Sequence, residues 1–526
     1  MNTIKEQGLF RLGISLTLTA SLLLSQAASA NTAEPLLHSI EPAQLALLAG
    51  AEYASAAELA EHMNQERYSS LLLVKHLLNR IHSLDKNGPT INAIIELNPD
   101  ALNVAAERDQ ERRMGKLRGP LHGIPVLIKD NIQTSDNLQT SAGSLALVGL
   151  PATQDAFIIQ QLRNAGAVIL GKTNLTELAG FRDPDIPSGW SARGGQTKNP
   201  HKLSADPCGS STGSAAAAAA GFAPLTVGTE TNGSIHCPSF MNGVVGLKPG
   251  LGLLSRTGII LVSRNQDTPG PITRTVRDAA LLLNAMMGDD SSDQLQRRNA
   301  AEPTDYTSRL NTNELSGKRI GYPSRYAPGS PEVDLDLNFS QALVAMTQAG
   351  ATLIPVEEPS YENSSYMERY QEFLFMDLNR EAPNWFSSRQ GMPVNSIEEL
   401  VNFNQHTPGI PVYGQSSVLS FIDTPYNETE YNELWTTLNT RSRQVIDNLM
   451  VEHSLDALVD SAESFAPTIV PVAGYPGITV PSGADEHGTL KGLYFYGTRW
   501  SEANLLGLAY SYEQATQARV NPTFTP

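Results

Sequence analysis

The sequence predicts an α/β fold: a single large α/β/α sandwich whose mixed, mostly parallel sheet is flanked by helices. Short apolar runs of strand length are the first observation, at residues 126–128 and 167–170. The second is an alternation of helix and strand, since a helical segment at 340–349 stands between strand-like runs at 319–322 and 352–355. Such alternation is typical of helices packed on a largely parallel sheet.

The other elements follow along the chain. Residues 57–113 carry apolar side chains at spacings of three and four, interrupted at Asn98-Pro99, and this pattern predicts helices. Residues 157–165 and the alanine run 215–220 predict two more helices. The last elements predicted are strands at 473–481 and 492–497 and a closing helix at 501–515.

Residues 1–30 have the three parts of a secretory signal peptide. Lys5 and Arg11 form a basic start, residues 12–24 a mostly apolar core, and Ala28-Ser29-Ala30 a small-residue cleavage site. The core is short for a membrane span, so the alternative of an uncleaved anchor is less favoured. The sequence therefore predicts an exported protein, periplasmic or secreted, without membrane attachment once the signal is removed.

The charge balance argues against anionic partners. The chain has 37 Lys and Arg against 54 Asp and Glu, a formal net charge of −17, which repels nucleic acid and anionic lipid. The ten histidines are scattered and there are two cysteines, so the sequence predicts neither a metal site nor a cofactor.

Residues 194–250 are unusually rich in Gly, Ser and Ala, with Gly209-Ser210-Ser211 before the alanine run and Gly233-Ser234-Ile235 after it. An ordinary helix cap is one interpretation. A phosphate loop is another, and residues 166–173 do spell Gly-x-x-x-x-Gly-Lys-Thr, but their middle residues are apolar and strand-like, so we take that match as accidental. The third is a serine hydrolase, since Lys129 stands upstream at the end of a predicted strand.

Five blocks of sequence carry a resemblance to a known family. In order they are Gly119-Pro120-Leu121-His122-Gly123-Ile124-Pro125, Gly171-Lys172-Thr173-Asn174, Gly209-Ser210-Ser211, Gly233-Ser234-Ile235 and Gly246-Leu247-Lys248-Pro249. From about Ala57 to Gln514 the chain resembles the amidase signature family, which hydrolyses amides with a lysine and two serines. The resemblance implies the same sandwich fold and one amidase domain, 31–526. The acidic charge argues against its transfer-RNA-dependent members.

Carried over by position, the resemblance gives each residue a role. Lys129 would be the base, Ser210 the bridging serine on a cis peptide bond, and Ser234 the nucleophile that forms the acyl-enzyme. The oxyanion hole would be the backbone N–H groups of Thr231, Asn232, Gly233 and Ser234. A lysine that acts near neutrality needs its pKa lowered from about 10.4 to near 7, which destabilises the charged form by about 4 kcal/mol.

Some positions bear on the substrate. Most members of the family have Gly where this chain has Asn232, and Arg where it has His236. Glu230 and Cys208, in contrast, resemble the residues of exported bacterial peptide amidases, which release ammonia from peptide C-terminal amides. The expected partner is thus a small-molecule or peptide amide. The sequence does not separate peptide, aryl and aliphatic amides, nor does it indicate the oligomeric state.

Two other functions compete with this one. Gly209-Ser210-Ser211-Thr212-Gly213 fits Gly-x-Ser-x-Gly, so an α/β-hydrolase esterase with Ser211 as nucleophile is an alternative, although that motif should follow a strand and residues 203–207 are polar. A non-catalytic exported binding protein on the same scaffold is the other. Intact Lys129, Ser210 and Ser234 argue against it.

Three further expectations concern packing. Residues 360–435 hold 13 of the 34 Phe, Trp and Tyr residues; we favour packing over a substrate funnel, although this helical region is the variable part of the family and a candidate for shaping the substrate site. Cys208 and Cys237 each lie within three residues of a proposed serine, and two buried free thiols are favoured over a disulfide. Arg256, Asp267, Arg274 and Asp278 fit the family's downstream pattern, and we expect their charges to pair structurally.

Overall fold

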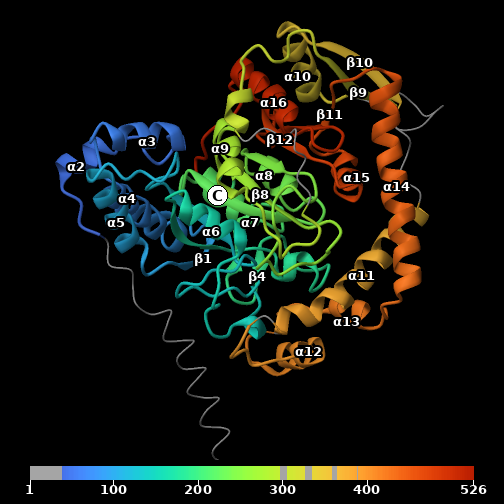
Figure 1. The fold of residues 1–526 in the computed structure, drawn as a ribbon, viewed down its shortest axis with the longest axis horizontal. Helices are drawn as coiled ribbons and strands as arrows, with labels where there is room; N and C mark the ends of the chain where they lie inside the picture. The colour runs from blue at the N-terminus through green and yellow to red at the C-terminus, as the bar shows by residue number, and fades with distance from the viewer. Residues whose placement is uncertain (1–37, 297–304, 326–334, 358–363, 388, 411) are drawn as a thin grey trace, which may run out of the picture. The chain divides into compact units, whose positions relative to one another are not determined.

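The computed structural model describes residues 38–296, 305–325, 335–357, 364–387, 389–410 and 412–526 (Figure 1). Residues Ile40–Pro526 form one compact unit. The predicted signal peptide, residues 1–30, lies outside the described residues.

An eleven-stranded sheet forms the centre of this unit. Its order is β1 (Ile94–Leu97), β3 (Val168–Thr173), β2 (Pro125–Lys129), β6 (Leu225–Glu230), β8 (Thr268–Thr273), β7 (Val245–Lys248), β12 (Gly477–Ala484), β13 (Leu490–Tyr496), β11 (Ala457–Ser461), β9 (Arg319–Arg325) and β10 (Thr352–Glu357). A second sheet pairs β4 (Trp190–Ser191) with β5 (Gly195–Gln196).

The large sheet is mixed. Parallel pairs join β3, β2 and β6 near one end and β11, β9 and β10 at the other. The strands from β6 to β11 pair antiparallel, as does β1 with β3. A mixed sheet flanked by helices confirms the predicted α/β sandwich.

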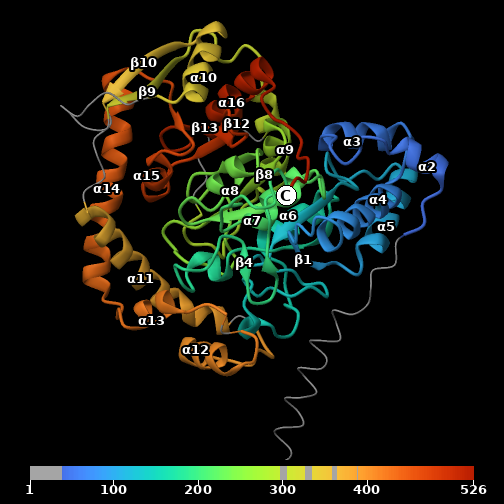
Figure 2. The ribbon, with the colours of Figure 1, turned by 180° about the vertical axis from the view of Figure 1, so that it is seen from behind.

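Helices cover the sheet and extend beyond it. Those described are α2 (Pro42–Leu47), α3 (Ala56–Asn64), α4 (Ser70–Ile81), α5 (Ala101–Arg113), α6 (Phe157–Asn164), α7 (Thr212–Ala219), α8 (His236–Met241), α9 (Val276–Met286), α10 (Leu337–Gln348), α11 (Ser364–Ser387), α12 (Ile397–His406), α13 (Ser416–Ile422), α14 (Glu428–Glu452), α15 (Ala466–Ala473) and α16 (Glu502–Thr516). Helix α7 packs on β2 and β6, while α9, α10 and α16 pack together on the sheet. Figure 2 shows α11 beside α14 and α13, as does Figure 1.

The apparent phosphate-loop motif is part of a strand. Strand β3 continues through Gly171-Lys172-Thr173 and is buried throughout. A Cβ at position 171 would overlap the carbonyl oxygen of Glu96 on β1, so this glycine admits a neighbouring strand. The Lys172 ammonium donates to the Ile132 carbonyl at 2.6 Å and to Thr140 Oγ1 at 2.9 Å. The interpretation of that motif as accidental is confirmed.

Candidate active site

Lys129 ends strand β2, as the sequence predicts, and its side chain is wholly buried. Its amine donates to Ser210 Oγ at 2.8 Å, to Ser211 Oγ at 2.9 Å and to the Thr229 carbonyl at 3.2 Å. All three partners are uncharged oxygens. Burial therefore lowers the pKa of Lys129 from 10.5 to about 7, although nearby carboxylates oppose this effect. Near neutral pH much of this amine is uncharged.

Ser210 lies two residues before the start of α7, on a loop held by close contacts. The peptide bond between Gly209 and Ser210 is cis, as the family resemblance implies. A Cβ at Gly209 would overlap Thr176 Oγ1, and the Thr176 N–H donates to the Ser210 carbonyl at 3.1 Å. These contacts hold the Ser210 backbone in place, and the Ser210 hydroxyl accepts the hydrogen bond from the Lys129 amine.

Ser234 lies in the turn between β6 and α8. Its carbonyl accepts a hydrogen bond from the Ser211 N–H at 3.1 Å, so the two serine-bearing loops touch. The residue before it, Gly233, has a φ of 74°, a conformation that favours glycine. Ser234 is 8% exposed, more than the 3% of Ser210, which places it nearer to solvent.

The buried carboxylate of Glu230 accepts hydrogen bonds from backbone groups of this turn. It accepts the N–H groups of Ile235 at 2.7 Å and His236 at 2.9 Å, and an interaction with the Gly233 N–H also lowers its pKa, although burial raises that pKa overall. A helix start with these donors satisfied needs no further cap.

Asn232 connects the same turn to the helical region 360–435. Its side-chain amide donates to the Tyr370 hydroxyl on α11 at 2.8 Å and to the Thr468 carbonyl at 3.1 Å. Tyr370 also accepts a hydrogen bond from Gln266 at 2.9 Å. The sequence showed Tyr370 as one aromatic among many, and nothing in it indicated this contact between residues 138 positions apart.

Cys208 and Cys237 form a disulfide, with an S–S distance of 2.03 Å and a Cα–Cα distance of 5.9 Å. The favoured expectation of two free thiols was wrong. Free cysteine is commonly buried, but here the loop of Ser210 and the helix after Ser234 approach to a Cα–Cα distance within the usual range for a disulfide. The bridge fastens the two serine-bearing segments together.

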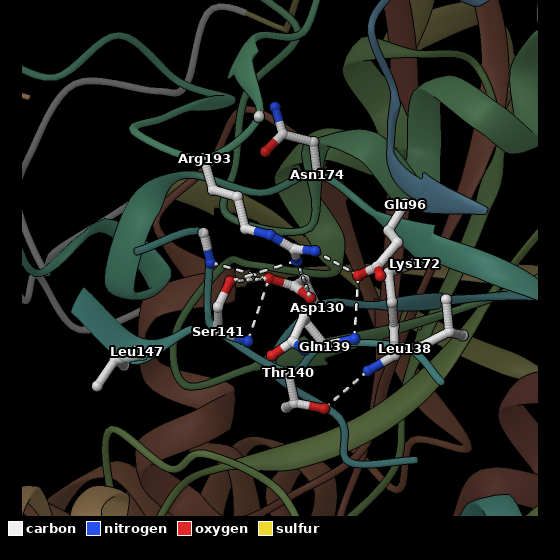
Figure 3. Close-up of polar contacts among 12 residues, drawn as sticks. Glu96, Asp130, Leu138, Gln139, Thr140, Ser141, Leu147, Lys172, Asn174 and Arg193 are labelled. Carbon is white, nitrogen blue, oxygen red and sulfur yellow. Dashed lines mark hydrogen bonds and ion pairs between the residues drawn. The ribbon is translucent and has the colours of Figure 1, made fainter. Parts of the chain in front are cut away.

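A network beside Lys129 neutralises its neighbour Asp130. Figure 3 shows the Arg193 guanidinium between the carboxylates of Asp130 and Glu96. Arg193 lies 3.1 Å from Asp130, which also accepts hydrogen bonds from the Ser141 hydroxyl at 2.5 Å and the Gly143 N–H at 3.1 Å. The charge of Asp130 is thus satisfied by the guanidinium of Arg193 and by hydrogen bonds from Ser141 and Gly143.

The expected pairing of the downstream charges holds in part. Arg256 forms an ion pair with Asp293 at 2.7 Å, which the sequence did not indicate, while Asp278 raises the otherwise lowered pKa of Arg274. Asp267 was expected to pair as well, and this was wrong. Among the described residues it makes no ion pair within 4.0 Å, because backbone and hydroxyl groups surround it.

The geometry disfavours Ser211 as an esterase nucleophile. Ser211 is wholly buried, and its hydroxyl donates to the Thr229 carbonyl at 3.0 Å and accepts the Thr229 N–H at 3.2 Å. Residues 203–211 contain no strand, whereas a nucleophile elbow must follow one. Ser211 therefore serves as a buried hydrogen-bond partner of the Lys129 amine.

No group of three or more His, Cys, Asp or Glu residues among the described residues could hold a metal ion. None of the described helices combines the length and the apolar character that crossing a membrane requires.

On this α/β sandwich a buried amine lies against a serine hydroxyl, next to a second serine-bearing turn. The family model for amidases matches residues 73–459. The chain belongs to the amidase signature family and is a hydrolase that acts on amides.

Several amidases are similar to this chain in sequence or in structure. Peptide amidase from Stenotrophomonas maltophilia is 43% identical with a TM-score of 0.84, over 90% of this chain and 99% of that one. An amidase family protein from Bacillus anthracis is 34% identical with a TM-score of 0.85, over 95% and 97%. A probable amidase of Arabidopsis thaliana is 37% identical over 481 residues, 90% of this chain and 91% of the relative.

Proposed function

We propose that this protein hydrolyses carboxylic amides through a Ser234 acyl-enzyme, with Ser210 and Lys129 completing a Ser-Ser-Lys triad. The observation that carries the proposal is the 2.8 Å contact between the buried Lys129 amine and Ser210 Oγ. An uncharged amine in that position has a lone pair for the Ser210 proton.

The steps follow from this arrangement. Lys129 takes the proton of Ser210, Ser210 takes that of Ser234, and Ser234 Oγ attacks the amide carbonyl. The tetrahedral oxyanion is stabilised by backbone N–H groups of Thr231, Asn232, Gly233 and Ser234, of which the Gly233 group also interacts with Glu230. The leaving amine takes a proton from Ser210. Water then attacks the acyl-enzyme by the same proton path and releases the acid.

Peptide C-terminal amides are the proposed substrates. The 43% identity to a peptide amidase over 99% of that chain supports this class, as do Glu230 and Cys208 in the site. Helices α11 to α14 shape the substrate site in this proposal, since Tyr370 on α11 reaches Asn232 in the turn that bears Ser234.

The triad is tested by substitution and labelling. Lys129→Ala, Ser210→Ala and Ser234→Ala should each lower kcat by at least about 10⁴-fold, since base and nucleophile act as a unit. Ser420→Ala on an exposed helix face is the control. A serine-directed phosphonate should label the Ser234 peptide. Labelling at Ser211, or wild-type turnover in Lys129→Ala with its fold kept, would refute the triad, and failure of any serine to react would favour the binding protein.

The substrate is tested by ammonia release. Amidated dipeptides, anilides and simple aliphatic amides are compared by kcat/KM, and amidated dipeptides should exceed the simple amides by at least about tenfold. Equal values would refute the peptide class while leaving amide hydrolysis intact.

We also propose export, with residues 1–30 removed. The disulfide supports it, because such bonds persist in oxidising compartments. N-terminal sequencing of protein from a periplasmic or secreted fraction should begin at Asn31. An intact N-terminus in a membrane fraction would favour the uncleaved anchor.

A further inference from the structure

Gln266 lies on the segment that leads into β8, and its side chain reaches the turn that bears Ser234. The side-chain amide uses both of its hydrogens, since Nε2 donates to the Thr231 carbonyl at 3.1 Å and to the Tyr370 hydroxyl on α11 at 2.9 Å. A carbonyl oxygen can only accept a hydrogen bond, so the Thr231 contact fixes which end of the amide faces the turn. Gln266 therefore links α11 to the proposed oxyanion loop.

The Thr231 carbonyl belongs to the same peptide unit as the N–H of Asn232, one of the proposed oxyanion donors. This peptide bond is trans, so its C=O and N–H point in opposite directions. Because Gln266 holds the carbonyl, the Asn232 N–H points away from Gln266 in a fixed direction. A hydrogen bond accepted by the carbonyl also polarises the peptide unit, which strengthens its N–H as a donor.

The Asn232 side chain holds the same peptide unit from its other end. Its amide donates to the Tyr370 hydroxyl at 2.8 Å and to the Thr468 carbonyl at 3.1 Å. The buried Tyr370 hydroxyl thus accepts from both Gln266 and Asn232. One tyrosine of α11 is therefore joined to the carbonyl side and to the N–H side of one oxyanion-loop peptide.

The segment that carries Gln266 is itself fastened to the helical region 360–435. The Ser263 hydroxyl donates to Asp377 on α11 at 2.5 Å, and the Asn265 amide donates to the Tyr431 hydroxyl on α14 at 2.7 Å. The position of Gln266 is therefore set by the same helices that contact the Ser234 turn.

Stability alone does not account for a glutamine at this position. Gln266 is 1% exposed, and its Oε1 has no hydrogen-bond partner in the described part of the chain. A buried acceptor without a donor is unfavourable, and an apolar side chain of the same size would avoid it. What the glutamine adds is the pair of donations to Thr231 and Tyr370.

We propose that Gln266 is a positioning residue of the reaction, which acts through the Thr231–Asn232 peptide unit by aiming its N–H at the oxyanion. The inference rests on the proposed Ser234 chemistry. The direction of this N–H matters most when the substrate carbonyl carbon is tetrahedral, since its oxygen then carries the charge. Loss of the Gln266 contacts should therefore weaken transition-state binding more than substrate binding.

The test compares two ligands in Gln266→Met, which keeps the length of the side chain and removes the donor. A peptide aldehyde forms a tetrahedral adduct with Ser234 and places an oxygen where the oxyanion develops, whereas the corresponding peptide acid binds without an adduct. Gln266→Met should lower kcat for an amidated dipeptide roughly 10- to 100-fold with KM nearly unchanged. The Ki of the aldehyde should rise by a similar factor, and that of the acid by less than about twofold.

Asn98→Leu is the matched control. Asn98 is also a buried amide that donates to a backbone carbonyl, that of Ile169, at 2.8 Å. Its other side-chain hydrogen bonds join Asp136 and Asp100, so none of them reaches the two serine-bearing loops. This variant should keep the kcat, the KM and both Ki values of the wild type.

A purely structural role for Gln266 would lower the Tm and would move both Ki values equally or not at all, and either result overturns the inference. If Gln266→Met does not fold, Tyr370→Phe decides the matter, because it removes the other partner of the Gln266 amide. A selective loss of aldehyde affinity in Tyr370→Phe supports the inference, and equal or absent shifts overturn it.

Ser234→Ala is assayed alongside to separate this inference from the proposed function. Amide hydrolysis retained by Ser234→Ala refutes the proposed function itself. An inactive Ser234→Ala beside unselective Ki shifts in Gln266→Met refutes the role of Gln266 alone.

Discussion

Removal of the Cys208–Cys237 disulfide should lower the thermal stability of the protein measurably. The bridge joins residues 29 positions apart. In the chain-entropy treatment, a closed loop of about 30 residues removes about 12 cal/mol/K from the unfolded chain, or about 3.6 kcal/mol at 25 °C. A compact unit of about 490 residues unfolds with an entropy near 1 kcal/mol/K. The double variant Cys208→Ser/Cys237→Ser should therefore melt about 3–4 °C below the wild type.

The assay follows melting by circular dichroism with and without reductant. Reductant should lower the Tm of the wild type and leave that of the double variant unchanged. Activity should be lost at a lower temperature than secondary structure in the double variant, because the bridge joins the loop of Ser210 to the helix that follows Ser234. Equal Tm values within about 1 °C, or two titratable thiols in unreduced, denatured wild type, would refute the reasoning.

Two further predictions concern the site. Wild-type kcat/KM should fall about tenfold per pH unit below pH 7, because Lys129, with a pKa of about 7, must be uncharged to accept a proton; a profile that stays flat from pH 8 to pH 5 contradicts this. Tyr370→Phe leaves the Asn232 and Gln266 amides each without one acceptor, so kcat/KM for amidated dipeptides should fall roughly 5- to 150-fold, an effect of about 1–3 kcal/mol. Tyr413→Phe is its control, since no described hydrogen bond uses that hydroxyl, and equal kinetics in the two variants would rule out the Tyr370 contact as a determinant of activity.

Strands β2 and β3 could be predicted from the sequence, because both are buried and include continuous apolar runs. Strands β6 and β7 are equally buried and were not predicted. Strand β1 was missed because four residues at a sheet edge give no periodicity. Strand β8 was not predicted as a strand either, since Pro269 and Pro271 remove two ladder donors and normally exclude an interior position.

The candidate site was predicted from local motifs, and what escaped prediction depends on contacts distant in sequence. Ser210 stands in the Gly209-Ser210-Ser211 block, and Lys129 follows a short apolar run of strand length. The disulfide, the Asn232–Tyr370 contact and the missing ion pair of Asp267 depend on how separate segments meet. Sequence spacing holds no information on a Cα–Cα distance of 5.9 Å between residues 29 apart.

A lowered lysine pKa does not by itself identify the base. Burial lowers the pKa of Lys172 and of Lys248 to about 8, close to the value of about 7 for Lys129. Lys172 donates to the Ile132 carbonyl and to Thr140, and Lys248 to the Pro249 carbonyl at 2.9 Å, so both fill structural positions. Lys129 differs because its amine meets two serine hydroxyls on a loop that touches the Ser234 turn. The contacts of the amine, and not its pKa, separate the proposed proton acceptor from the buried structural lysines.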